Sequence, residues 1–165
     1  MSDFDECIYS ENIIEDIKWL DENGYTVVFP QWIEVISKTN VPEYQDGRLL
    51  HELVDGGIPL KSDVGHPSKV LFFKPSCISE MNYEVGAHTC SPKGNIKMCQ
   101  KLNTIHFKNL GIEYILNRYS EYRPRMSKIN LEKKWGYHYS LSNNVHKAYI
   151  NDNIKNAKHI KDILI

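Results

Sequence analysis

The sequence predicts an α/β fold, because helical and strand-like patterns alternate in its first half and helical patterns fill its second half. Between Asn12 and Asn23, Ile13, Ile17 and Leu20 recur at helical spacing, with acidic and basic residues on the other face. The following segment, Tyr25–Ser37, is rich in Val, Ile, Phe and Trp, which is typical of a strand. We therefore expect a small mixed sheet with packed helices and a helical C-terminal segment.

Composition indicates an ordinary globular chain of one-domain size. The chain has 165 residues and a formal net charge of −1, so no global charge favours nucleic acid or a membrane surface. None of its four cysteines forms a Cys-x-x-Cys pair, which argues against a zinc site. Reduced thiols are expected rather than a disulfide, for which Cys90 and Cys99 would be the candidates. No signal peptide or transmembrane run is recognisable, so a cytoplasmic location is expected.

The middle of the chain predicts loops and short strands. Residues Lys38–Ser68 carry many Gly and Pro, with one short helix near Leu49–Val54, and such a stretch is often a binding loop or a lid. Three strand candidates follow, Lys69–Lys74, Tyr83–Thr89 and Asn103–Phe107.

The second half predicts helices. A helical pattern runs from Leu110 and ends before Pro124, and Ser127 can cap a second helix. The polar tail from Asn143 to Ile165 is weakly helical. We accordingly divide the chain into residues 1–142 and a polar helical tail, 143–165.

The acidic start is the densest group of hard oxygen ligands in the sequence. Asp3-x-Asp5 is followed directly by Glu6. At a strand end two such carboxylates can converge on Mg²⁺ or Mn²⁺, although a solvated terminus would show the same pattern. Phosphatases of the haloacid dehalogenase type also begin with Asp-x-Asp, but they have an apolar strand before the motif, which is missing here.

A second group of polar residues surrounds a predicted turn. Gly86-Ala87-His88 ends a strand candidate, and Lys93 follows in the turn Ser91–Asn95. A neutral imidazole can bind a metal ion, and a Lys can contact phosphate oxygens. A surface His beside a hairpin would give the same pattern.

Seven segments, in this order, resemble a group of bacterial and viral glycosyltransferases of family-2 type with the GT-A fold. They are D-F-D-E-C-I-Y-S, G-Y-T-V-V-F-P, S-K-V-L-F-F-K-P, N-Y-E-V-G-A-H-T, P-K-G-N, I-H-F-K-N-L-G-I-E-Y-I-L-N-R-Y and W-G-Y-H-Y. The resemblance covers the chain from Asp3 to about Tyr139 and implies a partial GT-A-like fold. It also implies transfer of a sugar, with inversion, from a nucleotide-sugar donor to a glycan or lipid-linked acceptor.

The resemblance further implies a metal site and a substrate pocket. Asp3 and Asp5 would hold Mn²⁺ or Mg²⁺ on the donor diphosphate, with His88 as a further ligand. Lys69, Lys93 and His106 would line the donor or acceptor pocket. The catalytic base would be a carboxylate near the acceptor, for which we select Asp55 or Glu84.

The resemblance does not include the nucleotide-binding half that, in such enzymes, precedes the Asp-x-Asp motif. We therefore expect either a partner that supplies this half or a homo-oligomer. The alternative function is a non-catalytic remnant or binding module that holds a glycan or a partner protein.

One further region is strongly basic. Between Lys93 and Lys134 there are ten Lys and Arg residues and three Glu residues, with aromatic residues interleaved. A solvated helix face is the simplest interpretation. Binding of nucleic acid, of anionic glycans, or of an anionic inner membrane surface are the alternatives.

Overall fold

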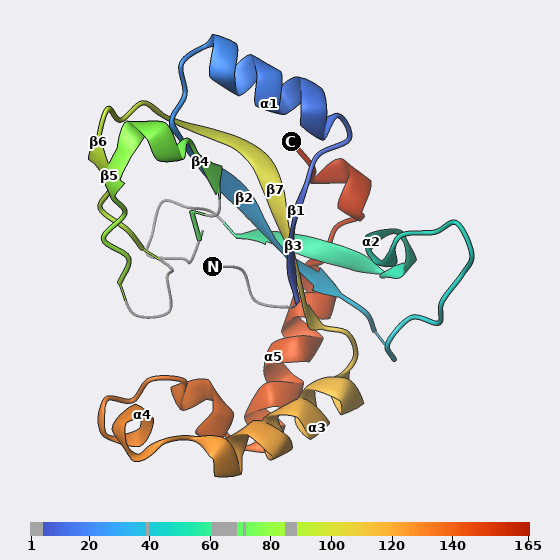
Figure 1. Cartoon of the computed structure of the whole chain (residues 1–165). Coiled ribbons are helices and arrows are strands. Elements are labelled where there is room, and N and C mark those ends of the chain that lie inside the picture. Colours follow the sequence, from blue (N-terminus) through green and yellow to red (C-terminus); the bar gives the residue numbers. More distant parts are fainter. Residues whose placement is uncertain (1–4, 39, 61–68, 71, 85–88) are drawn as a thin grey trace. The chain divides into compact units, whose positions relative to one another are not determined.

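The computed structural model describes residues 5–38, 40–60, 69–70, 72–84 and 89–165, and Figure 1 shows their α/β arrangement. The main sheet has five strands in the order β1-β7-β2-β3, with β4 also paired to β2, and β5 and β6 form a separate two-stranded sheet. The strands are β1 Glu6–Tyr9, β2 Val27–Ile36, β3 Gly56–Leu60, β4 Phe72–Phe73, β5 Ile78–Glu80, β6 Lys93–Gly94 and β7 Met98–Asn109. The predicted α/β class, with a small sheet and a helical C-terminal segment, is confirmed at this level.

The α-helices of the described residues are α1 Ile13–Glu22, α2 Leu50–Leu53, α3 Ile112–Tyr122, α4 Lys128–Glu132 and α5 Asn143–Asn156. Short 3-10 turns are η1 Pro75–Cys77, η3 Arg123–Arg125, η4 Tyr137–Ser140 and η5 Ile160–Asp162. None of these helices has the length and apolar character that crossing a bilayer requires. All four cysteines are free thiols, as predicted.

The chain divides into two compact units. The first contains Met1–Glu34, Pro59–Phe107 and Lys161–Ile165, and the second contains Val35–Ile58 and Lys108–Ile160. Each unit has its own apolar core.

The core of the first unit forms where α1 packs on the sheet. Leu20 of α1 contacts Val28 of β2 and Leu102 of β7, and all three side chains are almost fully buried. The C-terminus is tied to the same sheet, because Asn103 Nδ2 donates to the Ile165 carbonyl at 3.0 Å and Asn103 Oδ1 accepts from the Ile165 N–H at 3.2 Å.

The core of the second unit lies between α3 and α5. Ile115 and Tyr119 of α3 pack against Ile150 of α5, and Figure 1 shows the two helices side by side. Ser127 caps α4 as predicted, since its Oγ accepts from the Asn130 N–H at 3.2 Å.

Several predicted bounds differ from the structure. The Gly56–Gly57 segment, predicted as loop, forms β3, and the strand predicted at Asn103–Phe107 extends to Met98–Asn109. α1 begins at Ile13, and the side chain of its N-cap residue, Asn12, makes no capping hydrogen bond.

Candidate metal centre

Three neighbouring strands bring acidic side chains around one histidine in the first unit. In the antiparallel pair of β1 and β7, Glu6 lies directly opposite His106, so the two side chains share one face of the sheet. Strand β2, the other neighbour of β7, contributes Glu34. Asp5 directly precedes β1, and its carbonyl accepts from the Phe107 N–H at 2.7 Å, which fixes its backbone beside β7. We call Asp5, Glu6, Glu34, Lys69 and His106 the carboxylate–histidine cluster.

His106 lies between two carboxylates. Its Nδ1 is 2.7 Å from Glu34 Oε1, and its Nε2 is 3.5 Å from Asp5 Oδ2. The Trp32 indole donates to the same Glu34 oxygen at 3.1 Å, and its ring packs edge-on against the imidazole. These contacts fix both the position of the Glu34 carboxylate and the orientation of the imidazole.

Electrostatics favour the charged form of His106 in the metal-free protein. Burial lowers the pKa of this imidazole, but the hydrogen bonds to Asp5 and Glu34 and their negative charges outweigh burial and raise the pKa to about 9. At neutral pH both nitrogens of the imidazole are therefore protonated, and a metal ion bound at Nε2 would displace the proton on that nitrogen.

Lys69 neutralises the remaining acid of the cluster. Its Nζ lies 2.7 Å from Glu6 Oε1, and the two side chains are only 4% and 2% exposed. An ion pair buried this deeply is costly to break, because either partner alone would leave a charge in a medium of low polarity.

Three side chains of the cluster offer ligand atoms of the types that hold divalent cations in proteins. One ligand atom each from Asp5, Glu6 and His106 lies within 4.8 Å of the other two. Donors that share one cation at about 2.1 Å lie about 3 Å apart when adjacent and about 4.2 Å apart when opposite, so these side chains would have to move closer together to bind it. Two carboxylates and an imidazole suit Mn²⁺ well, whereas Mg²⁺ prefers oxygen donors alone.

The structure brings together some of the residues that the sequence suggested. Asp5, Lys69 and His106 meet in the cluster. Asp3 and His88, the other two predicted metal ligands, lie outside the described residues. The described part of the site thus joins the acidic start of the chain to His106 on β7.

The other predicted site residues have different partners. Lys93, on β6, forms an exposed ion pair with Glu80 at 2.8 Å. Glu84 accepts from the Thr89 hydroxyl at 2.9 Å. Asp55 belongs to the second unit, where its carboxylate accepts from the Lys38 N–H at 2.7 Å and so ties a loop to the start of β3.

Sequence reasoning missed Glu34. It is a single acid within the apolar strand segment V-V-F-P-Q-W-I-E-V-I and is 7% exposed. A carboxylate inside such a strand needs partners, because an unpaired buried charge is expensive. That mismatch between residue type and strand is the feature that could have identified it.

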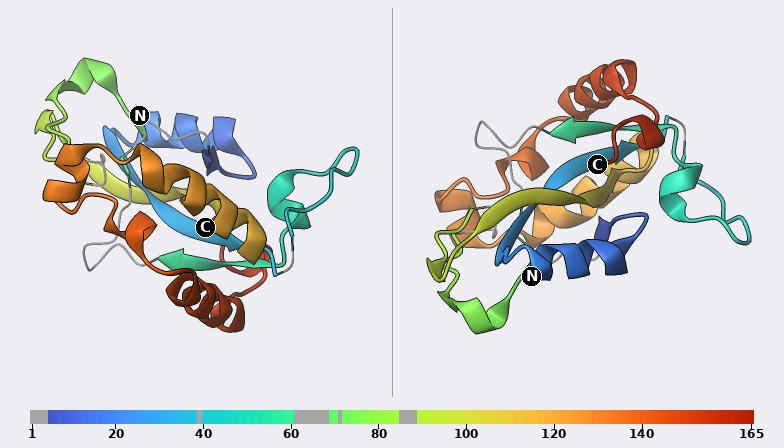
Figure 2. Two further views of the ribbon diagram at one scale, coloured as in Figure 1. Left: turned by 90° about the horizontal axis from the view of Figure 1, so that it is seen from below. Right: turned by 90° about the horizontal axis from the view of Figure 1, so that it is seen from above.

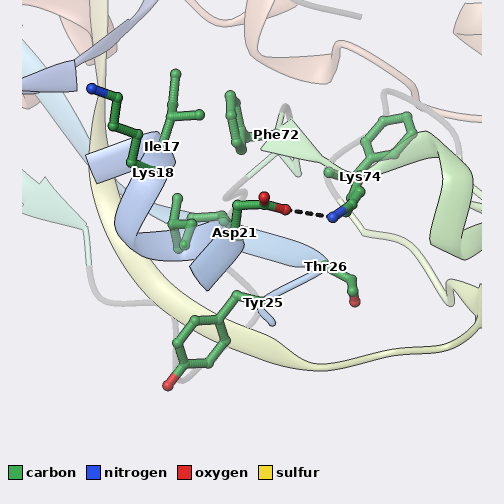
Figure 3. Close-up of a pocket in the computed structure, with 10 residues that line it drawn as sticks. Ile17, Lys18, Asp21, Tyr25, Thr26, Phe72 and Lys74 are labelled. Atoms are coloured by element: carbon green, nitrogen blue, oxygen red, sulfur yellow. Dashed lines mark hydrogen bonds and ion pairs between the residues drawn. The ribbon is translucent and has the colours of Figure 1, made fainter. Parts of the chain in front are cut away.

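A separate apolar pocket in the first unit has a different character. It encloses about 310 Å³ between α1, β2 and β4, and its walls include Leu20, Val28 and Phe72. Figure 3 shows the ion pair of Asp21 with Lys74 at this pocket. Among the residues that the structure describes, its lining has no His or Cys and a single acid, so the carboxylate–histidine cluster is the better candidate for chemistry.

Comparisons of the chain with protein-family models, with curated proteins and with solved structures each gave no match.

Proposed function

We propose that this chain binds a divalent cation, Mn²⁺ or Mg²⁺, through Asp5 and His106 and acts in sugar transfer from a nucleotide-sugar donor. The acceptor class is a glycan or a lipid-linked glycan. The observation that carries the proposal is that Asp5, Glu6 and His106, from the acidic start and from β7, offer ligand atoms within 4.8 Å of one another. The resemblance of the sequence to family-2-like glycosyltransferases supports the choice of reaction.

Each residue of the cluster has a separate task in this proposal. Asp5 and His106 Nε2 hold the cation, while Glu34 keeps the proton on Nδ1 and thereby aims Nε2 at it. Lys69 balances the charge of Glu6, the third member of the donor set. The bound cation would supply Lewis-acid stabilisation of the leaving nucleoside diphosphate.

The base that accepts the proton of the acceptor hydroxyl stays a prediction. Asp55 and Glu84 are the residues selected from the sequence, and the variants Asp55→Asn and Glu84→Gln test them. Loss of kcat at unchanged Mn²⁺ affinity would identify the base, since a base acts on the acceptor and not on the cation.

Calorimetric titration of the full chain tests the cation site directly. We expect Mn²⁺ to bind, and UDP or GDP to bind only when Mn²⁺ is present. Asp5→Asn and His106→Gln should each weaken Mn²⁺ binding at least about 100-fold, because each removes a direct ligand while keeping the side-chain size. His88→Gln, in parallel, measures what the other candidate histidine contributes.

The matched control is Asp46→Asn, an exposed acid of the second unit, which should leave Mn²⁺ binding unchanged. Mn²⁺ affinity that is equal in Asp5→Asn, His106→Gln and the wild type would contradict the cation site. Binding of Mn²⁺ with no effect on nucleotide binding would retain the cation site and contradict the transferase function.

A second candidate function is a non-catalytic binding module for a glycan or a partner protein. The observation that favours it is that the acids of the cluster already have internal cationic partners, Lys69 for Glu6 and His106 for Asp5 and Glu34. In that case the cluster only stabilises the sheet. Absence of both Mn²⁺ and nucleotide binding in a folded sample would select this function.

A further inference from the structure

One segment of the second unit has a charge very different from that of the whole chain. Residues 123–137, which we call the basic segment, include η3, α4 and the beginning of η4. Glu132 is the segment's single acid, so its net charge is +4 in a chain of net charge −1. The positive residues are Arg123, Arg125, Lys128, Lys133 and Lys134, all exposed.

The same segment exposes large apolar side chains. Ile129 is 52% exposed, Leu131 56%, Trp135 40% and Tyr137 65%. A single exposed Leu is ordinary, but four large apolar residues exposed within nine positions are an unusual concentration for a protein surface. Exposed apolar and positive side chains thus occur together in one short stretch of chain.

The structure holds this segment in a defined conformation. Arg123 donates through Nε to the Tyr139 carbonyl at 2.8 Å and through Nη2 to the Leu141 carbonyl at 3.1 Å. Gly136 has φ +68° and packs so closely on Tyr139 that a Cβ would lie 3.0 Å from its ring. Figure 1 shows α4 within the segment that joins α3 to α5. The exposed apolar residues are therefore not an unfolded tail.

We propose that the basic segment binds the surface of an anionic lipid bilayer. Lys and Arg interact with the negative headgroups, each contributing about a fivefold gain in partitioning near the surface. Ile129 and Leu131 insert among the upper acyl carbons, and Trp135 and Tyr137 lie at the headgroup level, where amphipathic rings are favoured.

Charge and apolarity together select this partner over the others. A nucleic acid offers negative charge, but its phosphate backbone gives exposed Ile and Leu side chains no apolar surface to contact. An anionic bilayer offers both kinds of contact side by side, as it does to amphipathic interfacial helices. This inference does not depend on the cation site of the first unit.

Flotation with lipid vesicles tests the proposal. At about 0.1 M salt, the full chain should bind vesicles of phosphatidylcholine and phosphatidylglycerol in a 7:3 ratio, and not vesicles of phosphatidylcholine alone. The triple variant Arg125→Gln/Lys133→Gln/Lys134→Gln should bind the anionic vesicles about 100-fold more weakly. A second triple variant, Ile129→Ser/Leu131→Ser/Trp135→Ser, keeps the charge and should also lose most of its vesicle binding.

The matched control is Lys147→Gln/Lys155→Gln/Lys158→Gln, which removes the same charge from exposed positions elsewhere in the second unit and should bind the vesicles like the wild type. The variant Trp19→Phe keeps two tryptophans, of which Trp32 is buried and Trp135 is exposed. The fluorescence of Trp135 should therefore shift to the blue on vesicle binding.

Three results would overturn the proposal. The first is equal binding to neutral and anionic vesicles, or none to either. The second is a control variant that loses as much binding as the Arg125/Lys133/Lys134 variant. The third is tight binding to single-stranded DNA that the Ile129/Leu131/Trp135 variant retains while vesicle binding is absent, which would assign the basic segment to nucleic acid.

Discussion

His106 and Glu34 show how neighbouring groups determine the orientation and the protonation of a single side chain. The imidazole Nδ1 is 2.7 Å from Glu34 Oε1, and the Trp32 indole donates a hydrogen bond to the same carboxylate oxygen. A carboxylate behind a ligating histidine fixes its tautomer and raises its basicity as a ligand. Glu34 is therefore a positioning residue for the proposed cation site.

At this scale we predict the effect of Glu34→Gln. Gln has nearly the shape of Glu but lacks the negative charge that faces His106 Nδ1. Mn²⁺ affinity should therefore fall about 10–100-fold. In the metal-free protein the pKa of His106 should fall from about 9 toward its ordinary range, because one of the two acids that raise it is gone.

Calorimetry measures the first effect of Glu34→Gln, and a histidine titration followed by NMR measures the second. Glu15→Gln, an exposed acid on α1, is the control and should change neither quantity. An unchanged His106 titration in Glu34→Gln would show that the 2.7 Å contact does not determine the protonation of this imidazole.

At the scale of elements, the Gly56–Gly57 pair begins β3, a strand that pairs with β2, and it also contacts the backbone at Lys158. The N–H of Gly57 donates to the Lys158 carbonyl at 2.8 Å, and the Lys158 N–H donates back at 3.0 Å. A Cβ on Gly56 would lie 2.6 Å from the Lys158 carbonyl oxygen. Glycine is needed here for close approach of two backbones, a requirement that local sequence rules interpret as a loop.

Gly56→Ala should therefore destabilise the protein by about 1–3 kcal/mol, because the two backbones must separate to admit the methyl group. Urea unfolding measures the change. Gly47→Asn is the control, since Gly47 has φ +72° and nothing within 4 Å of its Cβ position, and Asn tolerates this conformation. Equal stability of Gly56→Ala and the wild type would show that the contact with Lys158 is easily widened.

At the scale of the whole molecule, two histidines give stability opposite dependences on pH. For His106 the folded pKa of about 9 lies above the ordinary 6.5, so its stabilisation is fully present below pH 6.5 and is lost as the pH rises through 9. For His138, burial and then the charges of Lys108 and His146 lower the pKa to about 4. Its unfolded form binds a proton first, so stability falls as the pH drops from 6.5 toward 4.

We expect the metal-free chain to be most stable near pH 6.5. The loss between pH 6.5 and 9 should reach about 3 kcal/mol and should be absent in His106→Gln. The acid-side loss should shrink in His138→Gln. Urea unfolding at a series of pH values, with a chelator present, measures both, and a wild-type profile that is flat from pH 6.5 to 9 would contradict the charged His106.

The sequence by itself determined the elements whose information is local. Apolar spacing and turn residues predicted α1 and α3, and a Ser at the right position predicted the start of α4. The acidic start was also recognisable as a candidate site from its residue types, whereas His106 was a candidate only through the resemblance to family-2-like glycosyltransferases.

Only the tertiary structure decided which of these residues meet. The strand order β1-β7-β2 places His106 opposite Glu6 and beside Glu34, and buries Lys69 against Glu6. No local pattern contains this information, since pairing between distant strands is set by the packing of the whole sheet. For the same reason, local rules interpret Gly56 as a loop residue, and only the pairing of β3 with β2 makes it part of a strand.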